Sequence, residues 1–412
     1  MIQIRVVSGV EKFRDPSFDF KSCDTDWGVH GIHPYPAMMI YPIARRLLLE
    51  FTKKEDTVLD PFMGSGTVLV ESLLNERYGI GIDINPLAIL LARVKTTPIK
   101  ISLLEDNLHQ VLSREAIEKS AKRPEFFNLE FWFKDKITKD LARLLNQINL
   151  IEEEKIQSFF KVAFSETVRL CSNTNAGEFK LVRKKDFENH NPDVFRVFEK
   201  ISLKNIRKLQ ETYLRKLTTR IKIYERDTRY PLPIKPESVN LILTSPPYGD
   251  SKTTVAYGQF SRLSLQWLGY EKVNIDNESL GGNHRNYIEN DLPSLTLKKI
   301  LPKIRLKDEK RAREVLAFYK DFNKCLESIY DVLKVKGIIC FVLGNRRVAQ
   351  TTIPTDRIVL ELSQEFGLSH IKTITRSIPS KRMPTLNSPT NITGRTETTM
   401  NFENIIILQK SR

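Results

Sequence analysis

Short apolar runs alternate with amphipathic stretches over the first 100 residues of this chain and again after residue 220. Residues 56–76 (DTVLDPFMGSGTVLVESLLNE) predict a strand, a glycine turn and a helix, and residues 78–95 repeat this order around an acidic turn. Strand–turn–helix units in series are typical of a parallel sheet covered by helices. Further strands are predicted within 221–230, 237–248 and 321–345, and a closing strand pair at 370–378 and 401–410. The pattern therefore predicts an α/β fold.

Residues 101–220 follow a different pattern. They contain long amphipathic stretches with helical spacing of the apolar positions and no strand pattern. We interpret them as a helical insertion, which divides the sheet domain into residues 1–100 and 221–412. A polar, basic region at 250–315 follows the second group of strands. Its stretch 259–267, which contains Phe260 and Trp267, fits either a nucleic-acid contact or a packed helix equally well.

Composition narrows the class of protein. Of 412 residues, 41% are hydrophobic and 28% are charged, as in ordinary globular proteins. No run approaches the roughly 18 apolar residues of a membrane span, and the N-terminus lacks the apolar core of a signal peptide. We therefore expect a cytoplasmic protein without membrane contact. The four cysteines are widely spaced, and His30 and His33 have no nearby residues to complete a ligand set, so no metal site is expected.

The net charge of +15 favours a polyanionic partner, although a basic surface can also serve solubility alone. The excess is uneven along the chain. Residues 296–313 hold eight basic and two acidic side chains. Such a concentration outside the predicted strands is expected of a surface that follows phosphates.

A glycine turn at residues 59–67 (LDPFMGSGT) is the first candidate binding element. Glycines between a strand and a helix allow the backbone to approach a ligand closely, and the absence of a following lysine excludes a phosphate-binding P-loop. Asp83 ends the next predicted strand, where a carboxylate can accept both hydroxyls of a ribose. On its own this pattern also suits a nicotinamide cofactor, and Asp83 can equally serve as a helix cap.

The stretch LILTSPPYGDS (241–251) is the second candidate functional element. Its prolines end a strand abruptly and leave Ser245, Pro246, Pro247 and Tyr248 at the strand end. Taken alone, the stretch is as consistent with a proline-rich turn as with a catalytic site.

Together the two motifs resemble those of the DNA amino-methyltransferases, which methylate cytosine N4 or adenine N6. Residues 60–67 are similar to the cofactor loop of this family, and residues 244–248 to its catalytic motif. Residues 33–36 (His-Pro-Tyr-Pro) look like its N-terminal cofactor motif, and Asp227 matches an acidic position near the cofactor adenine. The resemblance covers roughly residues 20–100 and 221–412.

This resemblance implies a Rossmann-like methyltransferase fold with a mostly parallel seven-stranded sheet, S-adenosyl-L-methionine as cofactor and double-stranded DNA as partner. The implied catalytic residues are Ser245, Pro246, Pro247 and Tyr248. The implied cofactor-binding residues are His33, Pro34, Asp60, Pro61, Phe62, Gly64, Ser65, Gly66, Thr67, Asp83, Asn85 and Asp227.

In the resembling family a serine at the first motif position goes mostly with cytosine N4, which predicts a site-specific cytosine-N4 methyltransferase that flips its target base and transfers the methyl group directly. Adenine N6 is the alternative. An RNA methyltransferase and a non-catalytic nucleic-acid-binding protein are less favoured, and a dehydrogenase leaves the Ser-Pro-Pro-Tyr motif without a role. A restriction endonuclease is a candidate partner.

The order of the motifs departs from that of many Ser-Pro-Pro-Tyr enzymes, because the glycine loop precedes the catalytic motif. Target recognition therefore cannot be assigned by position in the chain. The helical insertion, the 250–315 region and the loop 377–398 are all candidates.

Overall fold

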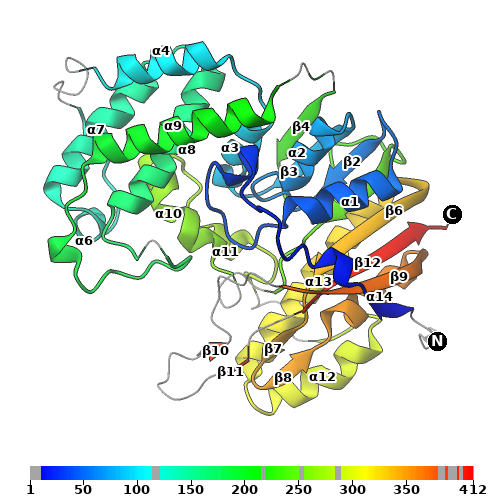
Figure 1. Cartoon of the computed structure of the whole chain (residues 1–412). Helices are drawn as coiled ribbons and strands as arrows, with labels where there is room; N and C mark the ends of the chain where they lie inside the picture. Colours follow the sequence, from blue (N-terminus) through cyan, green and yellow to red (C-terminus); the bar gives the residue numbers. More distant parts are fainter. Residues whose placement is uncertain are drawn as a thin grey trace.

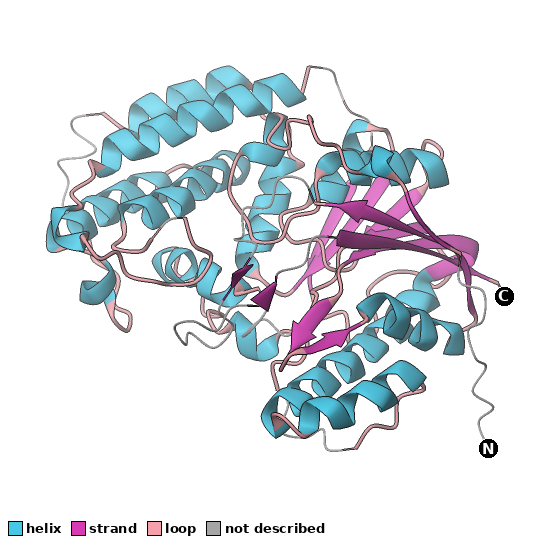
Figure 2. Ribbon diagram, turned by 60° about the horizontal axis from the view of Figure 1, so that its bottom comes forward, coloured by secondary structure: helices cyan, strands magenta, loops and turns pink. Residues whose placement is uncertain are grey.

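The computed structural model describes residues 11–113, 121–175, 177–214, 217, 219–249, 255–283, 289–378, 386–387, 397–398 and 402–411. A twisted central sheet is covered by helices on both faces, and a group of helices lies beside its β4 edge (Figures 1 and 2). The α/β class expected from the sequence is confirmed.

The central sheet has eight strands in the order β1-β9-β12-β6-β5-β2-β3-β4. All neighbouring strands are parallel except β12, which runs antiparallel to both β6 and β9. The predicted closing strand pair is thus confirmed. The strands span β1 (Lys12–Arg14), β2 (Thr57–Asp60), β3 (Tyr78–Asp83), β4 (Ile221–Glu225), β5 (Val239–Thr244), β6 (Leu333–Leu343), β9 (Leu368–Ser377) and β12 (Phe402–Lys410).

The predicted number of seven strands is wrong by one. The additional strand is β1, which pairs with the outer edge of β9. Its three residues, Lys-Phe-Arg, are all exposed, so it has no apolar pattern that could have revealed it.

Alternation along the strands separates the two faces of the core. Leu241 and Leu243 of β5 pack in the cluster that contains α1 (Tyr41–Phe51), whereas Ile242 packs in the cluster that contains α13 (Glu309–Val332). Because successive strand side chains point to opposite faces, a nearly continuous apolar run fits a strand covered on both sides. The other helices around the sheet are α2 (Thr67–Leu74), α3 (Pro86–Lys95), α12 (Leu295–Arg305) and α14 (Thr355–Glu365).

Between residues 101 and 212 the chain forms helices α4 (Ile101–Val111), α6 (Leu129–Trp132), α7 (Asp135–Asn149), α8 (Glu154–Cys171) and α9 (Val194–Thr212). They share one apolar core with α3 and with α10 (Tyr257–Trp267). Phe260 and Trp267 are buried in that core, and the indole of Trp267 packs edge-on against Phe133 and Phe164. Of the two interpretations of residues 259–267, the packed helix is therefore the one observed.

The shorter elements are η1 (Pro16–Phe18), η2 (Gly28–Gly31), η3 (Phe187–Asn189), α11 (Ile275–Glu278), and the strand pairs β7 (Arg346–Val348) with β8 (Thr351–Ile353) and β10 (Leu386–Asn387) with β11 (Glu397–Thr398). Most of the candidate recognition loop 377–398 lies outside the described residues, as do residues 250–254 and 284–288 of the basic region. Within the described chain, no helix combines the length and the apolar character needed to cross a membrane.

Candidate active site

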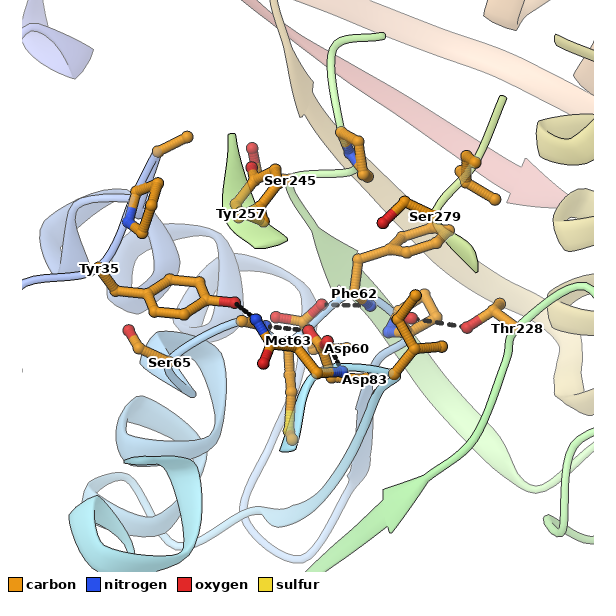
Figure 3. Close-up of a pocket in the computed structure, with 18 of the residues that line it drawn as sticks. Tyr35, Asp60, Phe62, Met63, Ser65, Asp83, Thr228, Ser245, Tyr257 and Ser279 are labelled. Carbon is orange, nitrogen blue, oxygen red and sulfur yellow. Dashed lines mark hydrogen bonds between the residues drawn. The ribbon is translucent and has the colours of Figure 1, made fainter. Parts of the chain in front are cut away.

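A pocket opens at the carboxyl ends of β2, β3 and β5, the edge of a parallel sheet where ligands bind in this class of fold. It encloses about 900 Å³ of space, part of it open solvent. In Figure 3, Ser245 lies above the loop that carries Asp60, Phe62 and Met63, with Tyr35 on one side and Ser279 on the other. Of the site residues predicted from the sequence, those that line the pocket are Asp60, Pro61, Phe62, Gly64, Ser65, Thr67, Asp83, Asn85, Asp227, Ser245 and Pro247.

The glycine loop enters α2 through left-handed backbone. Gly64 has φ +49° and Gly66, the residue before the helix, has φ +84°. A Cβ at position 66 would lie 2.8 Å from the Cβ of Ala92 on α3. Gly66 is therefore required for the contact between the loop and α3, although it does not line the pocket itself.

Asp83 connects this loop to the end of β3. Its carboxylate accepts hydrogen bonds from the backbone N–H groups of Gly64 and Asn85, each at 2.9 Å. Burial raises the pKa of Asp83 to about 6, while these backbone hydrogen bonds act in the opposite direction. The carboxylate is thus held in place at the pocket wall by main-chain donors.

Asp60 connects β2 to the strand that precedes the catalytic motif. Its Oδ1 atom accepts a hydrogen bond from the Thr244 hydroxyl at 2.6 Å and another from the backbone N–H of Phe62 at 3.1 Å. Burial raises the pKa of Asp60 to about 7, against the effect of both hydrogen bonds. Because Thr244 directly precedes Ser245, the glycine loop and the Ser-Pro-Pro-Tyr segment are positioned together.

The predicted N-terminal motif contributes in part. Pro36 to Met39 and Tyr35 line the pocket, and the Tyr35 hydroxyl accepts a hydrogen bond from the Asn85 amide at 3.1 Å. His33 and Pro34 are not among the lining residues. The His33 ring is buried, with Nε2 3.0 Å from the Ser165 hydroxyl, and burial lowers the pKa of His33 to about 3. In this structure His33 joins the N-terminal segment to α8.

Asp227 lines the pocket from the turn after β4. Its carboxylate forms an ion pair with Arg229 at 2.6 Å, and Arg229 also contacts Asp321 at 3.0 Å. The same guanidinium donates a hydrogen bond to the carbonyl oxygen of Glu278 at 2.7 Å. Arg229 therefore fixes Asp227 relative to the segment that contains α11.

The predicted catalytic motif, residues 245–248, is divided between the pocket and the protein interior. Ser245 and Pro247 line the pocket, whereas Pro246 is buried and Tyr248 is partly buried. The Tyr248 hydroxyl lies 3.2 Å from the Ser245 hydroxyl and donates to Glu403 at 3.0 Å. The two hydroxyl groups of the motif are thus in direct contact.

Several pocket residues were not predicted from the sequence. Tyr35 and Pro36 belong to the His-Pro-Tyr-Pro motif at 33–36, which is the sequence signal that points to them. Others have no motif and reach the pocket only through the tertiary fold. Among them are Arg226, Thr228, Tyr257, Ile275, Glu278, Ser279 and Leu280. In the described part of the chain no cluster of His, Cys, Asp and Glu could hold a metal ion.

Comparison with known proteins gives this geometry its context. A profile of the DNA methylase family matches residues 13–93. The type II methyltransferase M.MvaI of Kocuria varians is 41% identical over 422 aligned positions, which cover 95% of this chain and 93% of the relative. M.MjaII of Methanocaldococcus jannaschii is 32% identical over 35% of this chain and 29% of its own length.

Among solved structures, a SAM-dependent methyltransferase from Methanosarcina mazei aligns with a TM-score of 0.33 at 9% identity, covering 92% of this chain and 98% of its own. The rRNA methyltransferase aviRa of Streptomyces viridochromogenes aligns with a TM-score of 0.31 at 11% identity, covering 97% and 94%. The identity to M.MvaI extends over nearly the full length of both chains, and from it we conclude that this chain belongs to the type II DNA methyltransferases of the N6/N4 family.

Proposed function

We propose that this protein transfers a methyl group from S-adenosylmethionine to the exocyclic N4 amine of cytosine in duplex DNA, after the base has been flipped out of the helix. The observation that carries the proposal is that Ser245 of the catalytic motif and Asp83 of the cofactor motif line the same pocket. A methyl donor and an acceptor amine must meet in one site for direct transfer.

S-adenosylmethionine is the methyl donor of this family, and the pocket residues fit it. Asp83 offers a carboxylate for ribose hydroxyls, and Gly64, whose backbone is left-handed, presents no side chain to the pocket. We assign cofactor binding to the lining residues of the 60–67 loop together with Asp83, Asn85 and Asp227. When bound, the cofactor supplies a methyl group made electrophilic by the sulfonium.

The task of the protein is then to make the amine a better nucleophile. The lone pair of an exocyclic amine is delocalised into the base, and acceptors for its N–H groups favour a tetrahedral nitrogen. We assign this role to the Ser245 hydroxyl and the Pro246 carbonyl, which the two prolines hold rigidly. The ring of Tyr248 is our candidate for stacking on the flipped base.

Cytosine N4 is proposed over adenine N6 because serine occupies the first position of the motif. The helical insertion 101–220, the basic region 250–315 and the loop 377–398 are our candidates for target recognition. Exposed lysines on α12, Lys298 and Lys299, support a contact with phosphates. A restriction endonuclease that cuts the same site is the proposed biological partner.

The test is to supply labelled S-adenosylmethionine with duplex DNA and structured RNA as competing acceptors. The labelled nucleosides are then identified by mass spectrometry. We expect label in DNA as N4-methylcytosine. Label in N6-methyladenine would support the alternative target base, and label only in RNA would contradict the proposed substrate.

A further inference from the structure

A chain of hydrogen bonds runs from the pocket into the sheet through the Ser-Pro-Pro-Tyr motif. The Ser245 hydroxyl is 3.2 Å from the Tyr248 hydroxyl, which is 3.0 Å from Oε1 of Glu403. The second oxygen of Glu403 pairs with the guanidinium of Arg376. Only Ser245 of these four residues lines the pocket.

Glu403, at the end of this series of hydrogen bonds, is held in place by Arg376. Glu403 on β12 and Arg376 on β9 are directly opposite each other in the antiparallel pair. The Arg376 side chain is only 4% exposed, and its Nε donates to the backbone oxygen of Phe18 at 2.8 Å. Glu403 therefore remains in place with its charge balanced, and its Oε1 atom is available to Tyr248.

The chemistry of the Ser245, Tyr248 and Glu403 side chains determines which group donates in each hydrogen bond. An ionised carboxylate can only accept a hydrogen bond, so the hydroxyl proton of Tyr248 points to Glu403. The Tyr248 oxygen can then accept the hydroxyl proton of Ser245, which leaves the serine lone pairs free. Burial, followed by the charge of Glu403, raises the pKa of Tyr248 well above its usual value, so the tyrosine keeps its proton at neutral pH.

We propose that Glu403 is a positioning residue that acts through Tyr248 to present Ser245 as a hydrogen-bond acceptor toward the target amine. The proposal rests on the proposed function, in which Ser245 accepts an N–H of the base. It assigns a role in the reaction to a residue about 155 positions from the motif, on a strand that does not line the pocket. It also gives the tyrosine hydroxyl a function separate from stacking by its ring.

Two conservative substitutions remove the proposed donor and acceptor order of these hydrogen bonds. Tyr248→Phe keeps the ring and deletes the hydroxyl, and Glu403→Gln keeps the shape and replaces a pure acceptor with an amide that also donates. Each should slow single-turnover methyl transfer to unmethylated bacteriophage DNA by about tenfold. This loss is smaller than the roughly 10²-fold loss typical when a preorganised contact itself is removed, because the Ser245 hydroxyl is still present. The affinity for S-adenosylmethionine, measured by calorimetry, should stay at the wild-type value. Retained binding also shows that each variant is folded.

The deciding measurement repeats both substitutions in a Ser245→Ala background. If Glu403 and Tyr248 act through the serine hydroxyl, neither should slow transfer further there by more than about twofold. Equal slowing with and without Ser245, or no slowing in the wild-type background, would overturn the proposal. Ser245→Ala alone tests the proposed function separately, because wild-type transfer by that variant would remove the serine from the reaction.

Asp356→Asn provides a matched control. Asp356 on α14 is also a buried carboxylate in an ion pair, with Lys12 of β1 at 2.6 Å, and it does not line the pocket. Its substitution should leave the transfer rate at the wild-type value. A comparable slowing in this control would show that loss of any buried carboxylate is sufficient, and would overturn the specific role of Glu403.

Discussion

The carboxylate of Asp83 accepts a hydrogen bond from the backbone N–H of Gly64 at 2.9 Å, so the end of β3 and the glycine loop form one wall of the pocket. A single acidic side chain therefore both shapes the loop and faces the proposed cofactor site. We therefore expect its removal to affect cofactor binding directly.

We expect Asp83→Ala to weaken S-adenosylmethionine binding by about 1.5–3 kcal/mol, the scale of a hydrogen bond to a charged group. Isothermal titration calorimetry measures this directly. Asp56→Ala is the control, because Asp56 precedes β2 at the opposite end of the strands and its carboxylate also accepts a backbone N–H, that of Lys53. Equal affinities for wild type and Asp83→Ala would remove Asp83 from the site.

The buried carboxyl of Asp60 should make the stability of the cofactor-free protein depend on pH. Its pKa rises from 3.8 to about 7 on folding, so the folded state binds a proton more tightly than the unfolded state. This contribution to the free energy of unfolding is complete below about pH 4 and is lost as pH rises toward 7, by about 1.4 kcal/mol for each pKa unit.

Asp60→Asn removes that titration and keeps an oxygen that can accept the hydrogen bonds from Thr244 and Phe62. Denaturant unfolding at a series of pH values should show the variant gaining stability relative to wild type between pH 4 and pH 7. A difference that is constant across this range would mean that Asp60 does not titrate as its burial implies.

Gly66 should tolerate alanine poorly for two separable reasons. It has φ +84°, and a new Cβ would lie 2.8 Å from the Cβ of Ala92. Gly269 has a similar φ of +74° with nothing within 4 Å of a built Cβ, so Gly269→Ala measures the backbone strain alone. We expect about 1 kcal/mol of lost stability for Gly269→Ala and about 2–4 kcal/mol for Gly66→Ala. Similar losses would show that α3 moves away without cost.

DNA binding should weaken steeply with salt, and α12 should account for part of that dependence. Lys298 and Lys299 are exposed on this helix, and each phosphate contact contributes about 0.9 to the slope of log K against log salt. Charge reversal of both should reduce the slope by about 2. Reversal of Lys53 and Lys54, which are exposed before β2 and away from the pocket, should leave it unchanged. A wild-type slope for the α12 variant would locate the DNA elsewhere.

The sequence was most informative where local pattern and chemistry coincide. The strand–glycine–helix order around Gly64 and Gly66 predicted β2, the turn and α2, and the prolines after Thr244 marked the end of β5. The strand β1 was missed because three exposed residues pair with β9 only after the sheet exists. Glu403 fell in a predicted strand, but its contact with Tyr248 joins segments with no pattern in common.

Sequence pattern also does not reveal the residues that form the far wall of the pocket. Ser279 and Leu280 are about 200 residues from the glycine loop and belong to no motif, so only the tertiary structure brings them to the site. His33 shows the converse, since a motif position expected at the cofactor is instead hydrogen-bonded to Ser165 of α8. A role for His33 in cofactor binding stays a prediction of the resemblance.

The most direct test of the account compares genomic DNA from cells that express the wild-type chain with DNA from cells that express Ser245→Ala. Nucleoside mass spectrometry should find N4-methylcytosine in the first sample. At equal protein level and expression time, the second sample should contain at least about 10²-fold less, as expected for loss of a preorganised contact to the amine. N6-methyladenine in place of N4-methylcytosine, or equal N4-methylcytosine in both samples under limiting expression, would contradict the account.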